Sequence, residues 1–190
     1  ENRAELTLVV NAGSVLEDDD QQGLAHFTEH MAFNGSKNFP KNELVNYLES
    51  LGMKFGPEVN AYTSFDETVY GIKVPTDNPE FVDKGILVLY DWASQLSLET
   101  DQIDAERGII HEEWRMGQGA MDRMQNKFLA VLFHKSKYAE RLPIGLMEVV
   151  DNCDPEALRR FYRDWYRPDL MAVVVVGDFD AKEMEQKIIK

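Results

Sequence analysis

The stretch GLAHFTEHMAFNG, residues 23–35, holds two of the four histidines of a 190-residue chain. Residues four apart in a helix lie on the same face, so His26 and His30 can offer two imidazoles to one metal ion. Glu29 lies one turn after His26, close enough to reach a water on that ion without being a ligand. Two histidines on an amphipathic helix can also be ordinary residues with satisfied nitrogens. The stretch predicts a helix from Gly23 to about Phe33 that carries this candidate metal site.

The order of these three residues indicates a particular chemistry. Zinc accepts nitrogen and oxygen ligands, and a catalytic zinc site uses three protein ligands plus a water. The ion acidifies that water, and a nearby carboxylate can take its proton. Metalloproteases with an H-E-x-x-H motif use the same residue types, and H-x-x-E-H is the inverted form. We therefore expect His26 and His30 to be zinc ligands and Glu29 to be a general base.

A third ligand has to come from another element. The predicted helix ETDQIDAERGIIHEEW, residues 99–114, offers several carboxylates. Glu106 and Glu113 are two turns apart and share a face, whereas His111 and Glu112 point elsewhere. A glutamate on a helix most often faces solvent, so spacing alone leaves the third ligand open.

Composition limits the classes of function. The chain is 44% hydrophobic and 28% charged, as in globular proteins, and its formal net charge is −14. Such a surface repels phosphate backbones and anionic lipid, so no nucleic-acid partner is expected. No apolar run approaches the ~20 residues of a membrane span. The single cysteine, Cys153, excludes an internal disulfide. The ends, ENRAEL and EQKIIK, look like those of a piece of a larger protein.

Hydrophobic periodicity predicts an α+β fold, a mostly antiparallel sheet with helices packed on one face. We expect a single domain over residues 1–190. The run MAVVVVG (171–177) is typical of a buried strand. The other predicted strands cover 4–14 and, around a turn at 64–67, 59–75. Predicted helices cover residues 23–33, 43–51, 78–96, 100–134 and 155–166, with a short helical piece after 143 and a last helix at the C-terminal end. The helix 43–51 is capped by Asn42 and stopped by Gly52. The helix 100–134 is interrupted at Gly117 and Gly119.

Several stretches occur together in the order of a known family. They are HFTEHMAFNGSKNFP, VNAYTSFDETVY, ERGIIHEEW and AVVVVGDF. The combination resembles the pitrilysin/insulinase family of zinc metallopeptidases, the inverzincins, over nearly the whole chain. The resemblance implies the catalytic N-terminal domain of such an enzyme, one half of a clamshell. It also implies Zn²⁺ bound by the two motif histidines, with Glu29 as the base.

The resemblance also implies the third ligand. In the family an E-R-x-x-x-x-x-E pattern supplies it as the second glutamate, here Glu113, and Glu106 becomes a supporting acidic residue of the catalytic site. His30 and Glu113 are 83 positions apart (113 − 30 = 83), longer than is usual for the family. A literal residue count would select Glu106 instead, and Glu112 is a further alternative.

Substrate and partners follow from the same resemblance. The family's matching strand binds peptide by strand addition, in which main-chain hydrogen bonds give affinity. We therefore expect Asn60, Ala61 and Tyr62 to contact substrate, the alternative being an ordinary hairpin strand. A C-terminal homologous half or a second subunit is the expected partner. A periplasmic or cell-envelope location is weakly favoured.

The function expected is a zinc-dependent endopeptidase that cleaves peptides or small unfolded chains. One alternative is a non-catalytic family member that acts as a structural or assembly subunit; the intact HFTEH argues against it. Another is a binding module with a purely structural metal, which a fourth protein ligand would favour.

Overall fold

The structure is a computed structural model that describes residues 2–41, 43–50, 53 and 56–190. A four-stranded antiparallel sheet runs through it in the order β2-β3-β1-β4. The strands are β1 (Arg3–Val10), β2 (Val59–Thr63), β3 (Thr68–Pro75) and β4 (Met171–Gly177). The predicted α+β class and the antiparallel sheet are confirmed. The hairpin β2–β3 turns at 64–67, as the sequence predicts.

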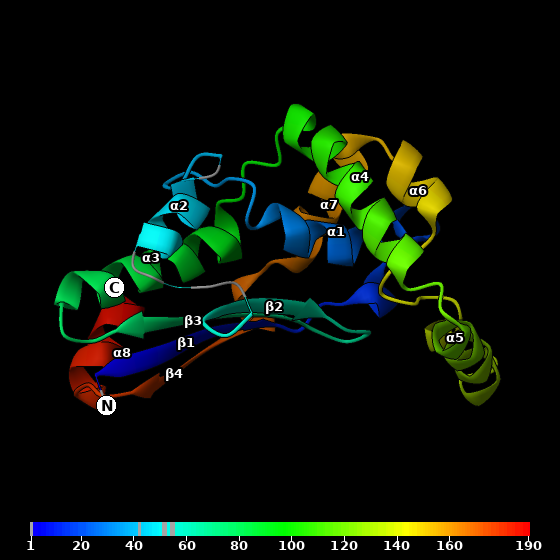
Figure 1. Cartoon of the computed structure of the whole chain (residues 1–190). Helices are drawn as coiled ribbons and strands as arrows, with labels where there is room; N and C mark the ends of the chain where they lie inside the picture. Colours follow the sequence, from blue (N-terminus) through cyan, green and yellow to red (C-terminus); the bar gives the residue numbers. More distant parts are fainter. Residues whose placement is uncertain (1, 42, 51–52, 54–55) are drawn as a thin grey trace.

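Eight α-helices and four short 3-10 turns complete the described part of the chain. The helices are α1 (Leu24–Met31), α2 (Glu43–Ser50), α3 (Pro79–Ser94), α4 (Thr100–Met116), α5 (Ala120–Leu132), α6 (Met147–Asn152), α7 (Pro155–Trp165) and α8 (Ala181–Ile189). The 3-10 turns are Ser14–Leu16, Asp19–Gln21, Lys137–Ala139 and Pro168–Leu170. Figure 1 shows α2 and α3 above the left-hand part of the sheet, with α1, α4, α6 and α7 gathered above and beside its right-hand end.

The sheet is one-sided because its strands alternate. In β1, Leu6 and Leu8 are fully buried beneath the helices, whereas Glu5 and Thr7 lie on the opposite face. Helix α3 lies across β1 and β3, and Gly85 allows the approach, since a Cβ there would lie 3.2 Å from Leu6 Cδ2. The resulting core holds the sheet, α2 and α3 together and carries α1 at its end.

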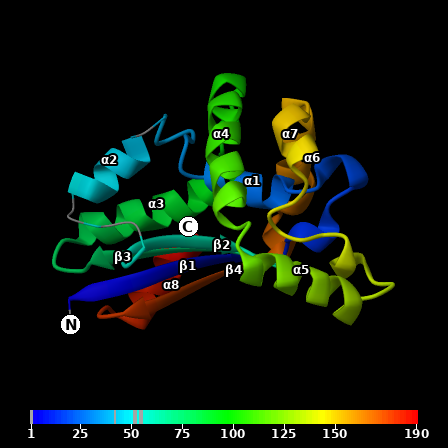
Figure 2. The ribbon, with the colours of Figure 1, turned by 45° about the vertical axis from the view of Figure 1, so that its right-hand side comes forward.

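Helix α1 is fixed from several sides. Its first residues pack on α7, and it also contacts β2 and α4. Trp92 of α3 is fully buried and donates its indole N–H to the carbonyl oxygen of Ala32, 2.9 Å away, just after α1 ends. Phe27 and Met31 are buried in a second cluster with residues of α4 and α7. The helix is therefore held rigidly between the sheet and α4 (Figure 2).

Strand β4 differs from its prediction as a buried strand. Val173, Val174 and Val176 are 40%, 49% and 67% exposed. The strand lies at the edge of the described sheet, so only β1 pairs with it. Val174 and Val176 pair with Thr7 and Glu5 and share their open face, whereas Val173 pairs with Leu8 and lines a cavity with residues of α3 and α8. An apolar, β-branched run identifies a strand, but burial also depends on which elements cover it.

The element boundaries agree with the predictions within a few residues. Asn78 and Asp154 cap α3 and α7 with their side chains. The helical conformation is interrupted from Gly117 to Gly119, and this interruption separates α4 from α5. Strand β1 ends at Val10, before the predicted 14, because the following segment hydrogen-bonds the tip of the β2–β3 hairpin. The predicted cap Asn42 and stop Gly52 lie outside the described residues. No described helix is long and apolar enough to cross a bilayer.

Candidate metal centre

Helix α1 begins without a capping side chain of its own. Gly23, at φ 103°, occupies the cap position, and the carboxylate of Glu17 accepts the N–H groups of Gly23 (3.1 Å) and Ala25 (2.8 Å) instead. Burial raises the pKa of the Glu17 carboxyl to about 7, although these N–H groups and Arg141 lower it. Glu17 thus satisfies the free N–H groups at the start of the helix that carries the histidines.

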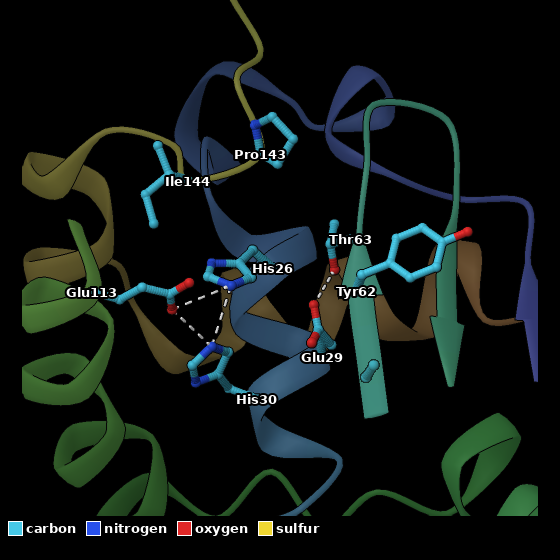
Figure 3. Close-up of a pocket in the computed structure, with 9 residues that line it drawn as sticks. His26, Glu29, His30, Tyr62, Thr63, Glu113, Pro143 and Ile144 are labelled. Carbon is cyan, nitrogen blue, oxygen red and sulfur yellow. Dashed lines mark hydrogen bonds and ion pairs between the residues drawn. The ribbon is translucent and has the colours of Figure 1, made fainter. Parts of the chain in front are cut away.

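Three potential ligand atoms converge between α1 and α4: two from histidines of α1 and one from a glutamate of α4. The Nε2 atoms of His26 and His30 are 3.2 Å apart, and Glu113 Oε2 lies 3.6 Å and 3.3 Å from them (Figure 3). A tetrahedral zinc ion with bonds of ~2.0–2.2 Å separates its ligands by about 3.3–3.5 Å. The three atoms therefore fit a zinc ion, and these residues form a group able to hold a metal.

The two imidazoles have different electrostatics. Burial, helped by the neighbouring His30, lowers the pKa of His26 to about 4, so His26 is neutral at neutral pH. Neutral imidazole is the form that binds metals. Its Nδ1 is buried and has no hydrogen-bond partner among the described residues.

His30 has a carboxylate behind it. Its Nδ1 lies 2.8 Å from Glu106 Oε1, and Asn34 Nδ2 donates to the second oxygen of Glu106 at 2.6 Å. Burial lowers the pKa of His30, but the hydrogen bond and charge of Glu106 outweigh it and the pKa is raised. Burial likewise raises the pKa of Glu106, and the bonds from His30 and Asn34 bring it below its usual value. A carboxylate on the far nitrogen fixes ring orientation and tautomer.

Glu29 points to the side of α1 that faces β2. Thr63 Oγ1 donates to Glu29 Oε2 at 2.7 Å (Figure 3). Thr63 also lies 3.5 Å from Thr68 Oγ1, which donates to the carbonyl oxygen of Ala12. Burial raises the pKa of the Glu29 carboxyl, while the bond from Thr63 lowers it. One carboxylate oxygen is thereby held, and the other has no hydrogen-bond partner among the described residues. The carboxyl group as a whole has a raised pKa.

A cavity of about 310 Å³ joins these groups. Its walls are the three ligand residues, Glu29, Ala61, Tyr62, Thr63, Pro143 and Ile144. Of the expected substrate residues, Ala61 and Tyr62 line it, and the Tyr62 ring turns away from the histidines toward the neighbouring strand. Asn60 is exposed and lies outside the cavity wall.

The other acidic candidates lie elsewhere. Glu112 forms an exposed ion pair with Arg115, and His111 faces Asp151 on α6. Glu106 reaches His30 from behind and does not line the cavity. Of the carboxylates on α4, Glu113 is the one placed beside both Nε2 atoms.

The sequence analysis did not identify five residues that belong to the site or support it. Thr63 and Asn34 sit inside the motifs NAYT and AFNG, and their polar side chains next to predicted site residues were a usable signal. Glu17 lies in an acidic loop, and Pro143 and Ile144 lie in a loop far along the chain. Nothing local distinguishes these three from ordinary loop residues.

A one-sided antiparallel sheet with an H-x-x-E-H helix at its end is the arrangement of the inverzincin class of metallopeptidases. A model of the insulinase domain (peptidase family M16) matches residues 1–142, and a model of the peptidase M16 inactive domain matches residues 152–190. The chain therefore belongs to the M16 peptidase family, which also contains pitrilysin-like proteins.

Named relatives agree with this family. "Probable zinc protease PqqL" of Haemophilus influenzae is 43% identical over 96% of the chain, and the zinc protease PQQL-like protein of Arabidopsis thaliana is 42% identical over 99%. A crystal structure of the periplasmic protease PqqL from Escherichia coli superposes with a TM-score of 0.95 at 41% identity, covering 99% of the chain and 21% of PqqL. The chain spans about 20% of the length of the first two relatives.

Proposed function

We propose that this chain carries the zinc site of an endopeptidase that cleaves peptides or small unfolded polypeptides. The main support is that the Nε2 atoms of His26 and His30 and Oε2 of Glu113 lie within 3.2–3.6 Å of one another. Glu29 lines the same cavity. Family membership and relatives named zinc proteases support the proposal.

The residues divide the chemistry between them. Zinc held by His26, His30 and Glu113 would supply an acidified water and polarise the scissile carbonyl. Glu29 takes the proton of that water and returns it to the leaving amine. Thr63 holds one oxygen of Glu29, and so keeps the other aimed into the cavity. Glu106, itself held by Asn34, orients His30.

The edge strand β2 is suited to bind a peptide main chain. Ser64 N donates to Glu67 O and Lys73 N to Glu58 O, so even-numbered residues of this strand bond β3. The N–H and C=O groups of Ala61 and Thr63 therefore point to the open edge. An extended substrate can add there as a further strand beside the metal centre. Asn60 and Tyr62 contribute side chains rather than main-chain bonds.

The wider setting of the enzyme is also a proposal. The chain spans about a fifth of relatives such as the Haemophilus protein, and we propose that it is the N-terminal catalytic domain, paired with a homologous second half or second subunit. The Escherichia coli relative is named a periplasmic protease, which favours a periplasmic or envelope location for this protein too.

The alternatives receive less support. A structural or assembly subunit has no need for a carboxylate of raised pKa in a cavity beside two histidines. A purely structural zinc site is closed by four protein ligands. The group found among the described residues has three, which leaves a position for water.

Measurements of metal content and of peptide cleavage in variants of the site residues test the proposal. The purified protein should bind one zinc, and His26→Ala or His30→Ala should abolish binding. Glu113→Gln removes a proposed ligand and should weaken zinc binding sharply. Glu106→Gln removes the support of His30 and should lower the affinity for zinc ~10- to 100-fold. Glu29→Gln should keep zinc while peptide cleavage by the longer enzyme falls ~10²- to 10⁴-fold. Equal zinc in the wild type and both histidine variants would refute the site, and loss of zinc in Glu29→Gln would make Glu29 a ligand.

A further inference from the structure

Glu113, the third candidate ligand, lies on a different helix from the two histidines. Its carboxylate oxygen is 3.6 Å and 3.3 Å from the Nε2 atoms of His26 and His30 on α1. The Glu113 side chain is 47% exposed, so packing around the side chain itself does little to fix it. Its distance from the histidines therefore depends on what holds α4 against the rest of the molecule.

Arg107 of α4 donates hydrogen bonds to the end of α6. Its guanidinium donates to the carbonyl oxygens of Val150 and Cys153, the second at 2.8 Å. Val150 is in the last turn of α6, and Cys153 directly follows the helix. The last carbonyl groups of a helix have no partner within it, and an arginine can supply one. Asp104, one turn earlier on α4, accepts from Arg107 Nε at 3.1 Å and so orients the guanidinium.

Helix α6 is in turn attached to the start of α1. Leu146 N, directly before α6, donates to the carbonyl oxygen of Gln22 at 3.3 Å. Gly145, at φ 71°, packs so closely on Gly23 that a Cβ on Gly145 would lie 2.2 Å from Gly23 Cα. Val150 is fully buried, and a Cβ on Gly23 would lie 2.9 Å from its Cγ2 atom. Helix α6 and the loop before it thus form one unit with the helix that carries the histidines.

Arg107 also contacts α1 directly. Its guanidinium carbon lies 5.9 Å from the centre of the ring of Phe27, which follows His26 in the chain. Glu106, the preceding residue of α4, points instead to His30, because successive residues of a helix are about 100° apart. The side chain of Arg107 is only 15% exposed, so these contacts are largely shielded from water. Arg107 therefore joins α4 both to α1 and to α6.

We propose that Arg107 is a positioning residue of the candidate metal centre and fixes α4 so that Glu113 reaches the ion held by the histidines. The proposal rests on the proposed function and adds a residue that touches neither metal nor peptide. In the pattern E-R-x-x-x-x-x-E the two glutamates already have roles, and the arginine between them acts through the placement of the helix. Its planar fork of donors suits two carbonyl oxygens at once, which the ammonium group of a lysine does not.

Metal binding by the intact 190-residue protein tests the proposal without turnover. Competition with a chelating dye gives the affinity for Zn²⁺ or Co²⁺, and the visible spectrum of bound Co²⁺ reports the number and geometry of its ligands. Arg107→Lys keeps the charge but loses the fork, so the affinity should fall about tenfold, as for other residues that orient a metal ligand. The Co²⁺ spectrum should shift toward that of Glu113→Gln.

Two comparisons separate positioning from a general effect on the fold. In a Glu113→Gln background, Arg107→Lys should lower the affinity no further, because the ligand that it places is already lost. Arg115→Lys is the matched control: it makes the same change on the same helix, at an exposed ion pair with Glu112, and should leave affinity and spectrum unchanged. Urea denaturation of each metal-free variant measures stability separately, and a purely structural Arg107 would change only that stability.

Asp104→Asn provides a second variant, at a position that is 61% exposed. It loosens Arg107 and should lower the affinity about two- to threefold. Asp101→Asn removes the same charge from α4 without touching Arg107 and should not.

Wild-type affinity and spectrum in Arg107→Lys, or equal losses with and without the Glu113 carboxylate, would overturn the positioning role and leave the proposed function standing. If Arg107→Lys does not fold, wild-type affinity in Asp104→Asn would overturn it in the same way. Failure of the wild-type protein to bind either ion would refute the proposed function, and the positioning role with it.

Discussion

Thr63 takes part in three features of the candidate site. Its hydroxyl donates to Glu29, the proposed general base, its backbone lies on the open edge of β2, and it lines the cavity of the candidate metal centre. Under the proposed function, the same residue would link peptide binding to the orientation of the base. A peptide strand bound to β2 would also contact the residue that holds the Glu29 carboxylate.

Substitution of Thr63 separates these two roles. Thr63→Val keeps the shape and the backbone but removes the donor, so we expect kcat of the longer enzyme to fall by about tenfold, the equivalent of one hydrogen bond to a charged group. KM and zinc content should stay near the wild-type values. Thr63→Ser, which restores the hydroxyl, should recover most of the rate. Steady-state kinetics on a fluorogenic peptide measures this, and a Ser variant as slow as the Val variant would contradict it.

Much of the candidate site is local in sequence, which is why its residues could be predicted. His26, Glu29 and His30 lie within one helical turn, so helix geometry alone places them together. Helix geometry alone leaves the choice between Glu106 and Glu113 open, because it depends on how α4 crosses α1; the prediction of Glu113 came from the resemblance to the family's E-R-x-x-x-x-x-E pattern. The structure sets Glu113 beside the Nε2 atoms and Glu106 behind His30, seven residues apart on one face.

At the scale of elements, α1 depends on a carboxylate outside it. Glu17 accepts N–H groups of Gly23 and Ala25 from a buried position. Its pKa of about 7 lies above the unfolded value of 4.5, so between these values the folded state holds a proton that the unfolded state has lost. The contribution of Glu17 to stability is then fully present below about pH 4.5 and declines as pH rises to about 7.

Glu17→Gln removes this pH dependence. We expect the free energy of unfolding of the wild type to fall by a few kcal/mol between pH 4.5 and pH 7 relative to that of the variant. Urea denaturation across the range, with Glu140→Gln at an exposed position as the control, measures the difference. Parallel pH profiles for the wild type and Glu17→Gln would show that Glu17 does not titrate in this window.

The type of each helix or strand could be predicted from the sequence, whereas the elements that pack against it could not. Periodicity identified β4 as a strand and α4 as a helix because both patterns are local. The place of β4 at the sheet edge depends on pairing with β1, about 170 residues away, and so its exposure was not predicted. The rigid attachment of loop 142–145 to α1 is non-local in the same way.

For the whole molecule, the edge strand β4 is an exposed apolar feature that bears on behaviour in solution. An unpaired apolar edge is a template for association with another chain. Val176 lies on the open face, and Val175, next to it, packs against the core. The large negative charge opposes association, but it is screened by salt.

A single lysine on the exposed side should improve solubility. Val176→Lys should reduce self-association in high salt, measured by analytical ultracentrifugation, and change the free energy of unfolding by less than about 0.5 kcal/mol. Val175→Lys, the adjacent control, should destabilise the fold by about 1–3 kcal/mol because it places a charge against the core. Unchanged association of Val176→Lys would assign the edge no role in it.

The contact between Gly23 and Gly145 also bears on when the candidate metal centre is assembled. It joins positions 122 residues apart (145 − 23 = 122), and the pairing of β1 with β4 spans the chain from end to end. Such high contact order makes folding slow, since chain entropy is lost before distant contacts form. Helix α1 is too short to persist alone in water, so the two imidazoles are presented together only once this long loop has closed. Under the proposed function, the two imidazoles would therefore be in place for zinc only in the folded chain, and zinc bound there would stabilise the fold.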